Sequence, residues 1–182
     1  MDRPRLATVW LGGCSGCHMS FLDLDEFLLD LAQQVDLVFS PILDIKKYPE
    51  NVDICLVEGA VCNEDHVEMA HKIRKQTRTV IAFGDCAVTG NVSAIRNQLG
   101  PANVDNILQR AYIDFADRNK KIPAAPGVLP VLLPRVMPLH EAIHVDYHLP
   151  GCPPPAARIK SFVVQLLEGK VPVLEGVDLK FG

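Results

Sequence analysis

Four cysteines in this chain of 182 residues stand in surroundings that suit metal binding. Cys14 and Cys17 lie in the glycine-rich segment GGCSGCH, Cys86 follows Gly-Asp, and Cys152 lies in the segment PGCPPP. Thiolates bind zinc, and four converging thiolates are the ligand set of a [4Fe–4S] cluster. Because long stretches separate Cys17, Cys86 and Cys152, only a folded protein can bring all four sulfurs together.

The elements that must position these cysteines follow an alternating pattern. Short apolar runs typical of buried strands are followed by stretches with the apolar spacing of helices. This alternation predicts an α/β fold, a flavodoxin-like three-layer sandwich with a mostly parallel sheet of about five strands, formed as a single domain by residues 1–182. The predicted strands are residues 6–11, 35–42, 52–57, 78–83 and 144–148; the predicted helices are residues 21–31, 63–75, 104–117 and 154–168; residues 119–135 are predicted to form an extended, proline-rich loop.

Three of the cysteines come directly after predicted strands. In open parallel sheets, sites form beyond the carboxyl ends of the strands. Cys14, Cys86 and Cys152 each lie just past such an end, while Cys17 lies near the start of the first helix, whose positive end favours a thiolate. The glycines beside the first two cysteines let the backbone approach an inorganic core closely. The placement therefore predicts one [4Fe–4S] site on these four residues.

Other kinds of site compete with a cluster at this stage. A thioredoxin-like redox pair would use Cys14 and Cys17 alone and would leave the other two cysteines idle. A structural zinc site usually has two close pairs, not one pair and two distant single cysteines. A phosphate-binding loop at residues 12–16 would hold a flavin phosphate, although this loop is poor in serine and threonine.

Three further residues in or beside the predicted strands are expected to be structural. Cys55 lies inside the run VDICLV and is expected to be a small buried core residue. Cys62 follows the same strand and is expected not to be a ligand. Trp10 ends the first predicted strand and is expected to belong to the core.

Composition excludes several classes of protein. The formal net charge of −4 gives no electrostatic footprint for nucleic acid. No apolar run is long enough to span a membrane. The sequence begins MDRPRL and runs straight into a predicted strand, without a cleavable apolar segment or a twin-arginine motif. We therefore expect a cytoplasmic protein, whose cysteines serve metal or redox chemistry more often than disulfides.

Several motifs occur in a distinctive order along the chain. They are the Cys-x-x-Cys after the first predicted strand, Val57-Glu58-Gly59 after the third, Gly84-Asp85-Cys86 after the fourth, and VDYHLPGCPP at residues 145–154. Together they resemble the small subunit of [NiFe] hydrogenases over nearly the whole chain. The chain has no export signal and no cysteines for further clusters after Cys152, so it is most similar to the cytoplasmic, bidirectional, NAD-linked (soluble) type.

This resemblance implies an electron-transfer role. Cys14, Cys17, Cys86 and Cys152 would bind a single [4Fe–4S] cluster, the one proximal to the Ni–Fe centre. The chain would relay electrons between a large subunit, whose Ni–Fe site oxidises H₂ or reduces protons, and diaphorase subunits that carry FMN, Fe–S clusters and NAD. The catalytic metal would then lie in a partner chain, and this chain would be one subunit of an NAD(P)-reducing hydrogenase.

Proton transfer is a second feature that the resemblance implies. Many relatives carry an acidic residue just before the first cysteine, where this chain has Gly13. Glu58 and Ser15 are therefore the candidates for a proton relay in this chain.

Two other functions stay open. The homologous cluster subunit of respiratory complex I has the same fold and passes electrons to quinone, but it typically has two adjacent cysteines where this chain has Cys14-Ser-Gly-Cys17. A flavin-binding electron carrier would also suit the predicted fold. A direct nicotinamide site is not expected, since the chain contains no Gly-x-Gly-x-x-Gly fingerprint.

Overall fold

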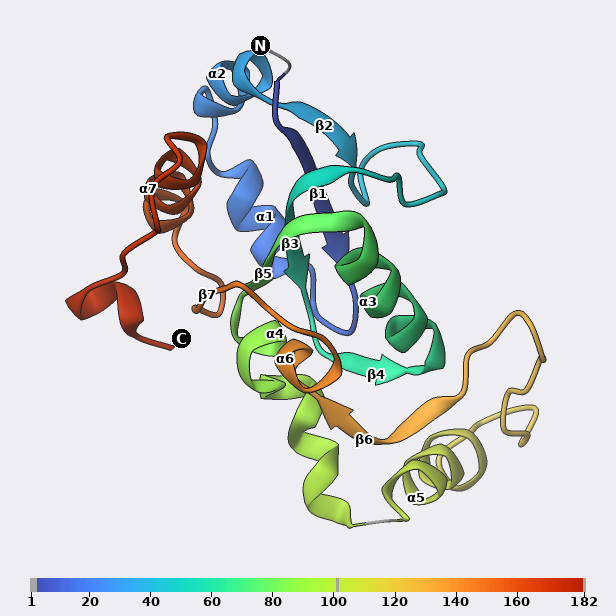
Figure 1. The fold of residues 1–182 in the computed structure, drawn as a ribbon. Coiled ribbons are helices and arrows are strands. Elements are labelled where there is room, and N and C mark those ends of the chain that lie inside the picture. Colours follow the sequence, from blue (N-terminus) through green and yellow to red (C-terminus); the bar gives the residue numbers. More distant parts are fainter. Residues whose placement is uncertain (1–2, 101, 182) are drawn as a thin grey trace.

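A computed structural model describes residues 3–100 and 102–181 of the chain. Its centre is a sheet of five parallel strands, which are β1 (Arg5–Trp10), β2 (Asp36–Phe39), β3 (Val52–Glu58), β5 (Thr77–Phe83) and β7 (Tyr147–Leu149). They lie in the order β2-β1-β3-β5-β7 (Figure 1). This is the flavodoxin-like order, in which the chain first moves to one edge of the sheet and then crosses to the other. The predicted α/β fold is confirmed.

Helices cover both faces of this sheet and make the three layers. One layer consists of α1 (Gly16–Leu22), α2 (Phe27–Gln34) and α7 (Ala156–Leu167), and the other of α3 (Glu64–Gln76), α4 (Asp85–Thr89) and α6 (Leu139–Ala142). Successive residues of a strand point to opposite faces, so Leu56 of β3 packs with the first layer, whereas Val57 packs with the second. Both side chains are fully buried, and burying such a side chain contributes about 2 kcal/mol.

The prediction of one helix over residues 21–31 is wrong. The structure has α1 and α2 there, separated by residues 23–26, and α1 begins earlier, at Gly16. Asp25 has a φ of 50°, which a right-handed helix does not allow. The leucine and phenylalanine spacing that suggested one helix comes from two short helices that bury residues against the same face of the sheet.

A small second sheet occupies part of the region predicted to be a loop. Residues 132–137 form β6 (Leu132–Met137), which pairs antiparallel with β4 (Val61–Asn63). The proline at position 134 argued against a strand, but Asn97 supplies the missing pairing: its side chain donates to the Val136 carbonyl and accepts from the Val136 amide, both at 2.9 Å. A side-chain amide thus takes the place of a neighbouring strand.

The segment between the two sheets is irregular. It contains η1 (Asn91–Leu99), a 3₁₀-helix, followed by α5 (Asn103–Gln109) and the π-helical turn η2 (Arg110–Asp114). The helix predicted over residues 104–117 is therefore shorter and ends in a π turn. The predicted helices at 63–75 and 154–168 are confirmed as α3 and α7, within two residues at each end. Among the residues that the structure describes, every helix is too short or too polar to cross a lipid bilayer.

Candidate metal centre

The four candidate cysteines lie together at the carboxyl edge of the parallel sheet. Cys14, Cys86 and Cys152 follow β1, β5 and β7, while Cys17 is the second residue of α1. Their charges act on the Cys17 thiol, which indicates that they lie near it. Its pKa is raised first by burial, then by the negative charges of Glu58, Cys86, Cys14 and Cys152. The structure thus brings together the cysteines that the sequence singled out.

The group of sulfurs opens toward solvent on one side. Cys17 is buried and Cys86 is half-buried, whereas Cys14 and Cys152 are exposed. Burial, followed by the charges of Cys14 and Cys152, also raises the pKa of Cys86. Four free thiolates would repel one another here, so the site is suited to positive charge that offsets them.

The first cysteine loop is fixed by a short antiparallel bridge. Gly12 donates to the Ala60 carbonyl and Ala60 donates to the Gly12 carbonyl, each at 2.9 Å. Ser15 then adopts a left-handed conformation with a φ of 65°, which turns the chain sharply into α1. This turn places the Gly16 amide 3.4 Å from the Cys14 sulfur. An amide that faces a sulfur in this way stabilises its negative charge.

Glu58 holds the start of α1 from the end of β3. Its carboxylate accepts from the Cys17 amide at 3.4 Å and from the His18 amide at 2.9 Å, and it pairs with the His18 ring through Nδ1. Glu58 is only 1% exposed. Buried carboxylates are costly unless they are paired and hydrogen-bonded, so these three contacts explain how the glutamate is tolerated. They also explain why the strand ends in Val-Glu-Gly.

Asp85 joins the second and third cysteine loops. Its Oδ1 accepts from the Gly151 amide at 2.6 Å, and its own amide donates to the Gly151 carbonyl at 2.9 Å. Because Asp85 precedes Cys86 and Gly151 precedes Cys152, this pair of hydrogen bonds sets the two cysteines beside each other. Asp85 is buried, which makes the charge-assisted bond to Gly151 stronger than one at the surface.

Gly84 allows the closest approach in the site. It has a φ of 80°, and a Cβ atom at this position would overlap the sulfur of Cys17. Glycine is the residue that accepts this conformation without steric cost. Each residue of the sequence Gly84-Asp85-Cys86 therefore has a role. Gly84 leaves room for the Cys17 sulfur, Asp85 binds the loop that carries Cys152, and Cys86 is one of the four candidate ligands.

The donors at this edge of the sheet are free thiols. Within residues 3–100 and 102–181, no three histidine, cysteine or acidic side chains gather closely enough to hold one metal ion. In a [4Fe–4S] cluster each cysteine binds a different iron, so the sulfurs are spread around the inorganic core. Four cysteines carried by three loops at one sheet edge are compatible with such a ligand set.

The remaining two cysteines lie in the strands β3 and β4. Cys55 is fully buried in β3, and burial raises the pKa of its thiol to about 12. Cys62 is half-buried in β4, and its sulfur donates to the Ala60 carbonyl at 3.4 Å. Neither thiol is among the groups that act on Cys17 or Cys86. Cys55 fills a core position, whereas the Cys62 sulfur lies against Gly12 in the first cysteine loop, in the space that a Cβ of Gly12 would occupy.

The expectation for Trp10 is wrong. Its side chain is 48% exposed, and its indole nitrogen lies 3.7 Å from the position that a Cβ of Gly13 would occupy. Trp10 is the last residue of β1, and it is exposed whereas the four residues before it are buried. The apolar sequence run suggested burial, but the end of the strand is at the surface.

The two candidates for a proton relay are tied to different partners. The Ser15 hydroxyl donates to the Cys14 carbonyl at 2.5 Å. The Glu58 carboxylate accepts from the Cys17 amide and is paired with the His18 ring. The sequence did not predict this His18–Glu58 pair, because the two residues are far apart in the chain. Proton transfer through Glu58 or Ser15 stays a prediction.

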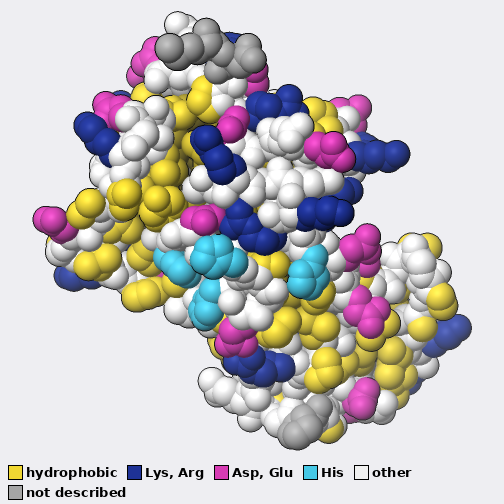
Figure 2. Space-filling view, viewed as in Figure 1, with side chains coloured by type: hydrophobic (Ala, Val, Ile, Leu, Met, Phe, Trp, Pro, Cys, Tyr) yellow, Lys and Arg dark blue, Asp and Glu magenta, His cyan; other side chains and the backbone are white. Residues whose placement is uncertain are grey.

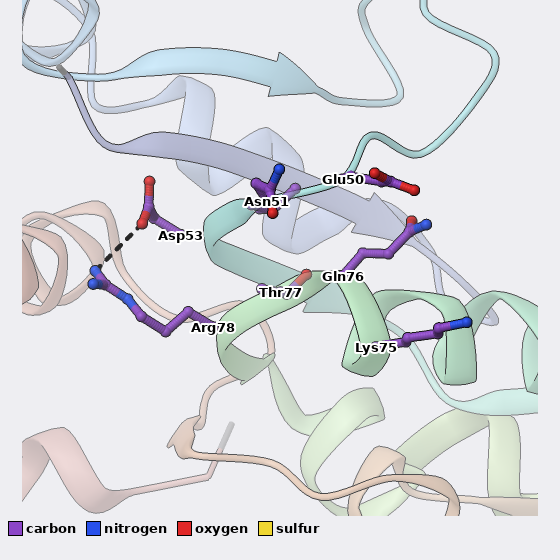
Figure 3. A pocket seen from close by; sticks show the side chains of 8 residues that line it. Glu50, Asn51, Asp53, Lys75, Gln76, Thr77 and Arg78 are labelled. Carbon is purple, nitrogen blue, oxygen red and sulfur yellow. Dashed lines mark ion pairs between the residues drawn. The ribbon is translucent and has the colours of Figure 1, made fainter.

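A cleft lies at the opposite edge of the sheet. It has a volume of about 510 Å³ and surrounds the first residues of β3 and β5 (Figure 3). Asp53 and Arg78 form an ion pair at one end of it, with 3.5 Å between their charged atoms. The cleft contains no cysteine. Its lining residues are Glu50, Asn51, Val52, Asp53, Lys75, Gln76, Thr77 and Arg78.

Most of the chain matches the model of one protein family. Residues 14–166 match the model of the family described as "NADH ubiquinone oxidoreductase, 20 Kd subunit", and the chain belongs to this family. Within it, the chain is similar to hydrogenase subunits. It is 37% identical over 172 residues to the NAD-reducing hydrogenase HoxS subunit delta of Cupriavidus necator, covering 91% of this chain and 79% of that protein. The predicted resemblance to hydrogenase small subunits is confirmed.

Other curated relatives are longer. The chain is 36% identical over 181 residues to one subunit of the F420-non-reducing hydrogenase of Methanothermobacter marburgensis, which covers 98% of this chain and 58% of that protein. It therefore spans less than two thirds of the length of several relatives that it matches, among them the corresponding proteins of Methanothermobacter thermautotrophicus and Methanococcus voltae.

Solved structures show the same relationship. One chain of an NAD⁺-reducing [NiFe]-hydrogenase in the H₂-reduced state superposes with a TM-score of 0.93 and 40% identity, with full coverage of both chains. A [NiFeSe] hydrogenase chain from Dm. baculatum superposes with a TM-score of 0.57 at 17% identity, covering 98% of this chain and 69% of that one. The second match shows a shared fold alone.

Proposed function

We propose that this chain holds one [4Fe–4S] cluster on Cys14, Cys17, Cys86 and Cys152. We propose further that it is the electron-transfer small subunit of an NAD-reducing [NiFe] hydrogenase. The observation that supports this most directly is the meeting of four cysteines from three loops at one sheet edge. When bound, the cluster would supply one-electron redox chemistry.

The residues of this chain would set the conditions for that chemistry. Gly84 leaves room for the Cys17 sulfur, Glu58 holds the start of α1, and Asp85 fixes the Cys152 loop. The Gly16 amide faces the Cys14 sulfur. Hydrogen bonds and burial of this kind tune the reduction potential of a cluster.

The exposure of part of the site supports a role in passing electrons to and from other protein chains. Cys14 and Cys152 are exposed, and Trp10 beside them is half-exposed. A redox centre at a surface needs a covering partner that shields it from water and lies within electron-transfer distance. We propose that this partner is a hydrogenase large subunit with a Ni–Fe site. Diaphorase subunits that carry FMN, Fe–S clusters and NAD would complete the complex in the cytoplasm.

An assay of iron and acid-labile sulfide on anaerobically purified protein tests the proposed cluster. We expect about four of each per chain. Zinc in place of iron, or flavin as the only chromophore, would contradict the proposal. The NAD-linked assignment is tested by H₂-dependent reduction of NAD⁺ with the whole complex.

One observation favours a second function. The matching family model is described as a subunit of NADH ubiquinone oxidoreductase, so a quinone-linked role would suit the same fold and cluster. Affinity purification from the source organism separates the two functions. A nickel-containing partner supports the hydrogenase, whereas a complex that reduces quinone and lacks nickel supports the alternative.

A further inference from the structure

Arg158, in the first turn of α7, connects two separate parts of the chain. Its Nη1 donates to the carbonyl of Pro150 at 2.8 Å, two residues before Cys152. Its other bonds reach residues 176–181, which we call the C-terminal segment. They go to the Val177 carbonyl at 2.8 Å, the Lys180 carbonyl at 3.2 Å and the Asp178 carboxylate at 3.3 Å.

The burial of this arginine makes its bonds interdependent. The Arg158 side chain is only 9% exposed, and a buried guanidinium is costly unless its donors are satisfied. Three of its four bonds, including the one to the acidic partner Asp178, depend on the C-terminal segment. If that segment left, the guanidinium would be better solvated by turning outward. The Pro150 carbonyl would then lose its donor.

The C-terminal segment in turn depends on Arg158. Its large apolar side chains point outward: Val177 is 66% exposed, Leu179 54% and Phe181 55%. Figure 2 shows hydrophobic side chains gathered at the surface over this segment and α7. Side chains that stay in water contribute little to packing, so the hydrogen bonds of Arg158 provide much of the attachment.

Two other contacts hold the Cys152 loop from within the site. Asp85 binds Gly151, and the Ser20 hydroxyl on α1 donates to the Pro154 carbonyl at 2.6 Å. These contacts link the loop to the elements that carry the other cysteines. Arg158 is different, because it links the loop to a peripheral segment.

We propose that Arg158 is a positioning residue for the Cys152 ligand, and that it holds the Pro150 carbonyl only while the C-terminal segment occupies its other donors. This inference rests on the proposed function, since the bound cluster is what reports the position of Cys152. The alternative is that Arg158 merely fastens the C-terminal segment to α7.

Spectroscopy of the full chain with its cluster distinguishes the two roles. Arg158→Ala is compared with a chain that ends at Glu175. The readouts are the electron paramagnetic resonance spectrum of the reduced cluster and the rate of iron loss to a chelator. We expect both variants to show the same altered spectrum and roughly tenfold faster iron loss, as is typical when a group supporting a metal ligand is removed. The combined variant should show no further change, because both changes break one connection.

Two further variants make the result decisive. Arg158→Lys keeps the positive charge but lacks the planar fork, so it should fold and still show the altered spectrum. Arg135→Ala is the matched control, since Arg135 pairs with Glu141 on an exposed surface, and it should behave as wild type. The proposal is overturned if Arg158→Lys and the shortened chain keep the wild-type spectrum and iron-loss rate, even when the segment becomes sensitive to protease.

The two proposals fail in different ways. If wild-type protein contains no iron and sulfide, the proposed function fails and the spectra cannot be recorded. If wild-type protein contains the cluster and the Arg158 variants leave it unchanged, only the positioning role fails.

Discussion

Gly84 determines how closely the Cys17 sulfur can approach the end of β5. A Cβ atom there would overlap that sulfur. We predict that Gly84→Ala greatly reduces the iron content of anaerobically purified protein, because the sulfur must move. Gly127→Ala is the matched control: Gly127 has a similar φ of 76°, but nothing lies within 4 Å of its would-be Cβ. Equal iron loss in both variants would mean that backbone strain, not the contact with Cys17, is responsible.

Glu58 is a single buried residue whose charge is costly unless its partners are present. Its carboxylate serves the Cys17 and His18 amides and the His18 ring. We predict that Glu58→Ala lowers the free energy of unfolding by about 3 kcal/mol, because the buried partners are left unsatisfied. Anaerobic urea unfolding measures this. Glu141→Ala, which removes an exposed partner of Arg135, should cost at most about 1 kcal/mol. Similar losses of unfolding free energy in Glu58→Ala and Glu141→Ala would show that the burial of Glu58 does not set the size of the effect.

At the scale of elements, β7 is held to β5 by few backbone contacts. Asp146, just before β7, supplements them: its carboxylate accepts from the Val80 amide at 2.7 Å and pairs with Arg74 at 2.6 Å. Burial alone would raise the pKa of Asp146, but the Val80 amide and the Arg74 guanidinium outweigh it and lower this pKa. The stability that this carboxylate contributes is therefore present above its ordinary unfolded pKa and is lost as the pH falls through the lower folded value.

This linkage gives a prediction that depends on pH. Asp146→Asn should lower the free energy of unfolding by about 2 kcal/mol at pH 7, and the difference from wild type should shrink below about pH 4. Urea unfolding at several pH values measures it. Asp44→Asn, at a residue whose side chain is 96% exposed, serves as control. A difference that does not change between about pH 7 and about pH 3 would show that the charge of Asp146 is not the cause.

Sequence patterns predicted the elements of the main sheet because burial on both faces leaves a clear signal. The run Ile54–Val57 of β3 and the run Val80–Phe83 of β5 are apolar and buried or nearly so, and the ends of both strands were found within a residue. The pattern failed where a partner distant in sequence decides the structure. The strand β6 contains a proline and exposed residues, and its course depends on pairing with β4 and on the side chains of Arg96, Asn97 and Asn103, which bind its backbone. The start of α1 likewise depends on Glu58, which lies in another element.

The candidate site was predictable to a similar extent. The positions of the four cysteines follow from strand ends in a parallel sheet. The groups around them do not, because their roles arise from contacts between distant segments. Arg158 and Ser20 resemble ordinary helix residues in the sequence, and their bonds to the Cys152 loop appear only in the structure.

At the scale of the whole molecule, the candidate site lies at an edge of the sheet where two of its four cysteines are exposed to solvent. Cys14 and Cys152 are exposed beside the half-exposed Trp10. We predict that the chain produced alone loses its iron to a chelator faster than the same chain in complex with its large subunit, because the partner would cover the exposed cysteines. Iron content after timed exposure to the chelator measures both rates. Equal rates for the two preparations would contradict this prediction.

The wide spacing of the cysteines along the chain also constrains the order of events during biosynthesis. Cys152 follows β7, which leaves the ribosome after the other four strands of the parallel sheet and lies at its outer edge. When Cys14 and Cys17 emerge, the residues that complete their surroundings have not yet been made. Iron delivered at that moment would find two thiols of the four. The metal centre that we propose can therefore be completed only after translation has passed β7, when the whole parallel sheet has been synthesised.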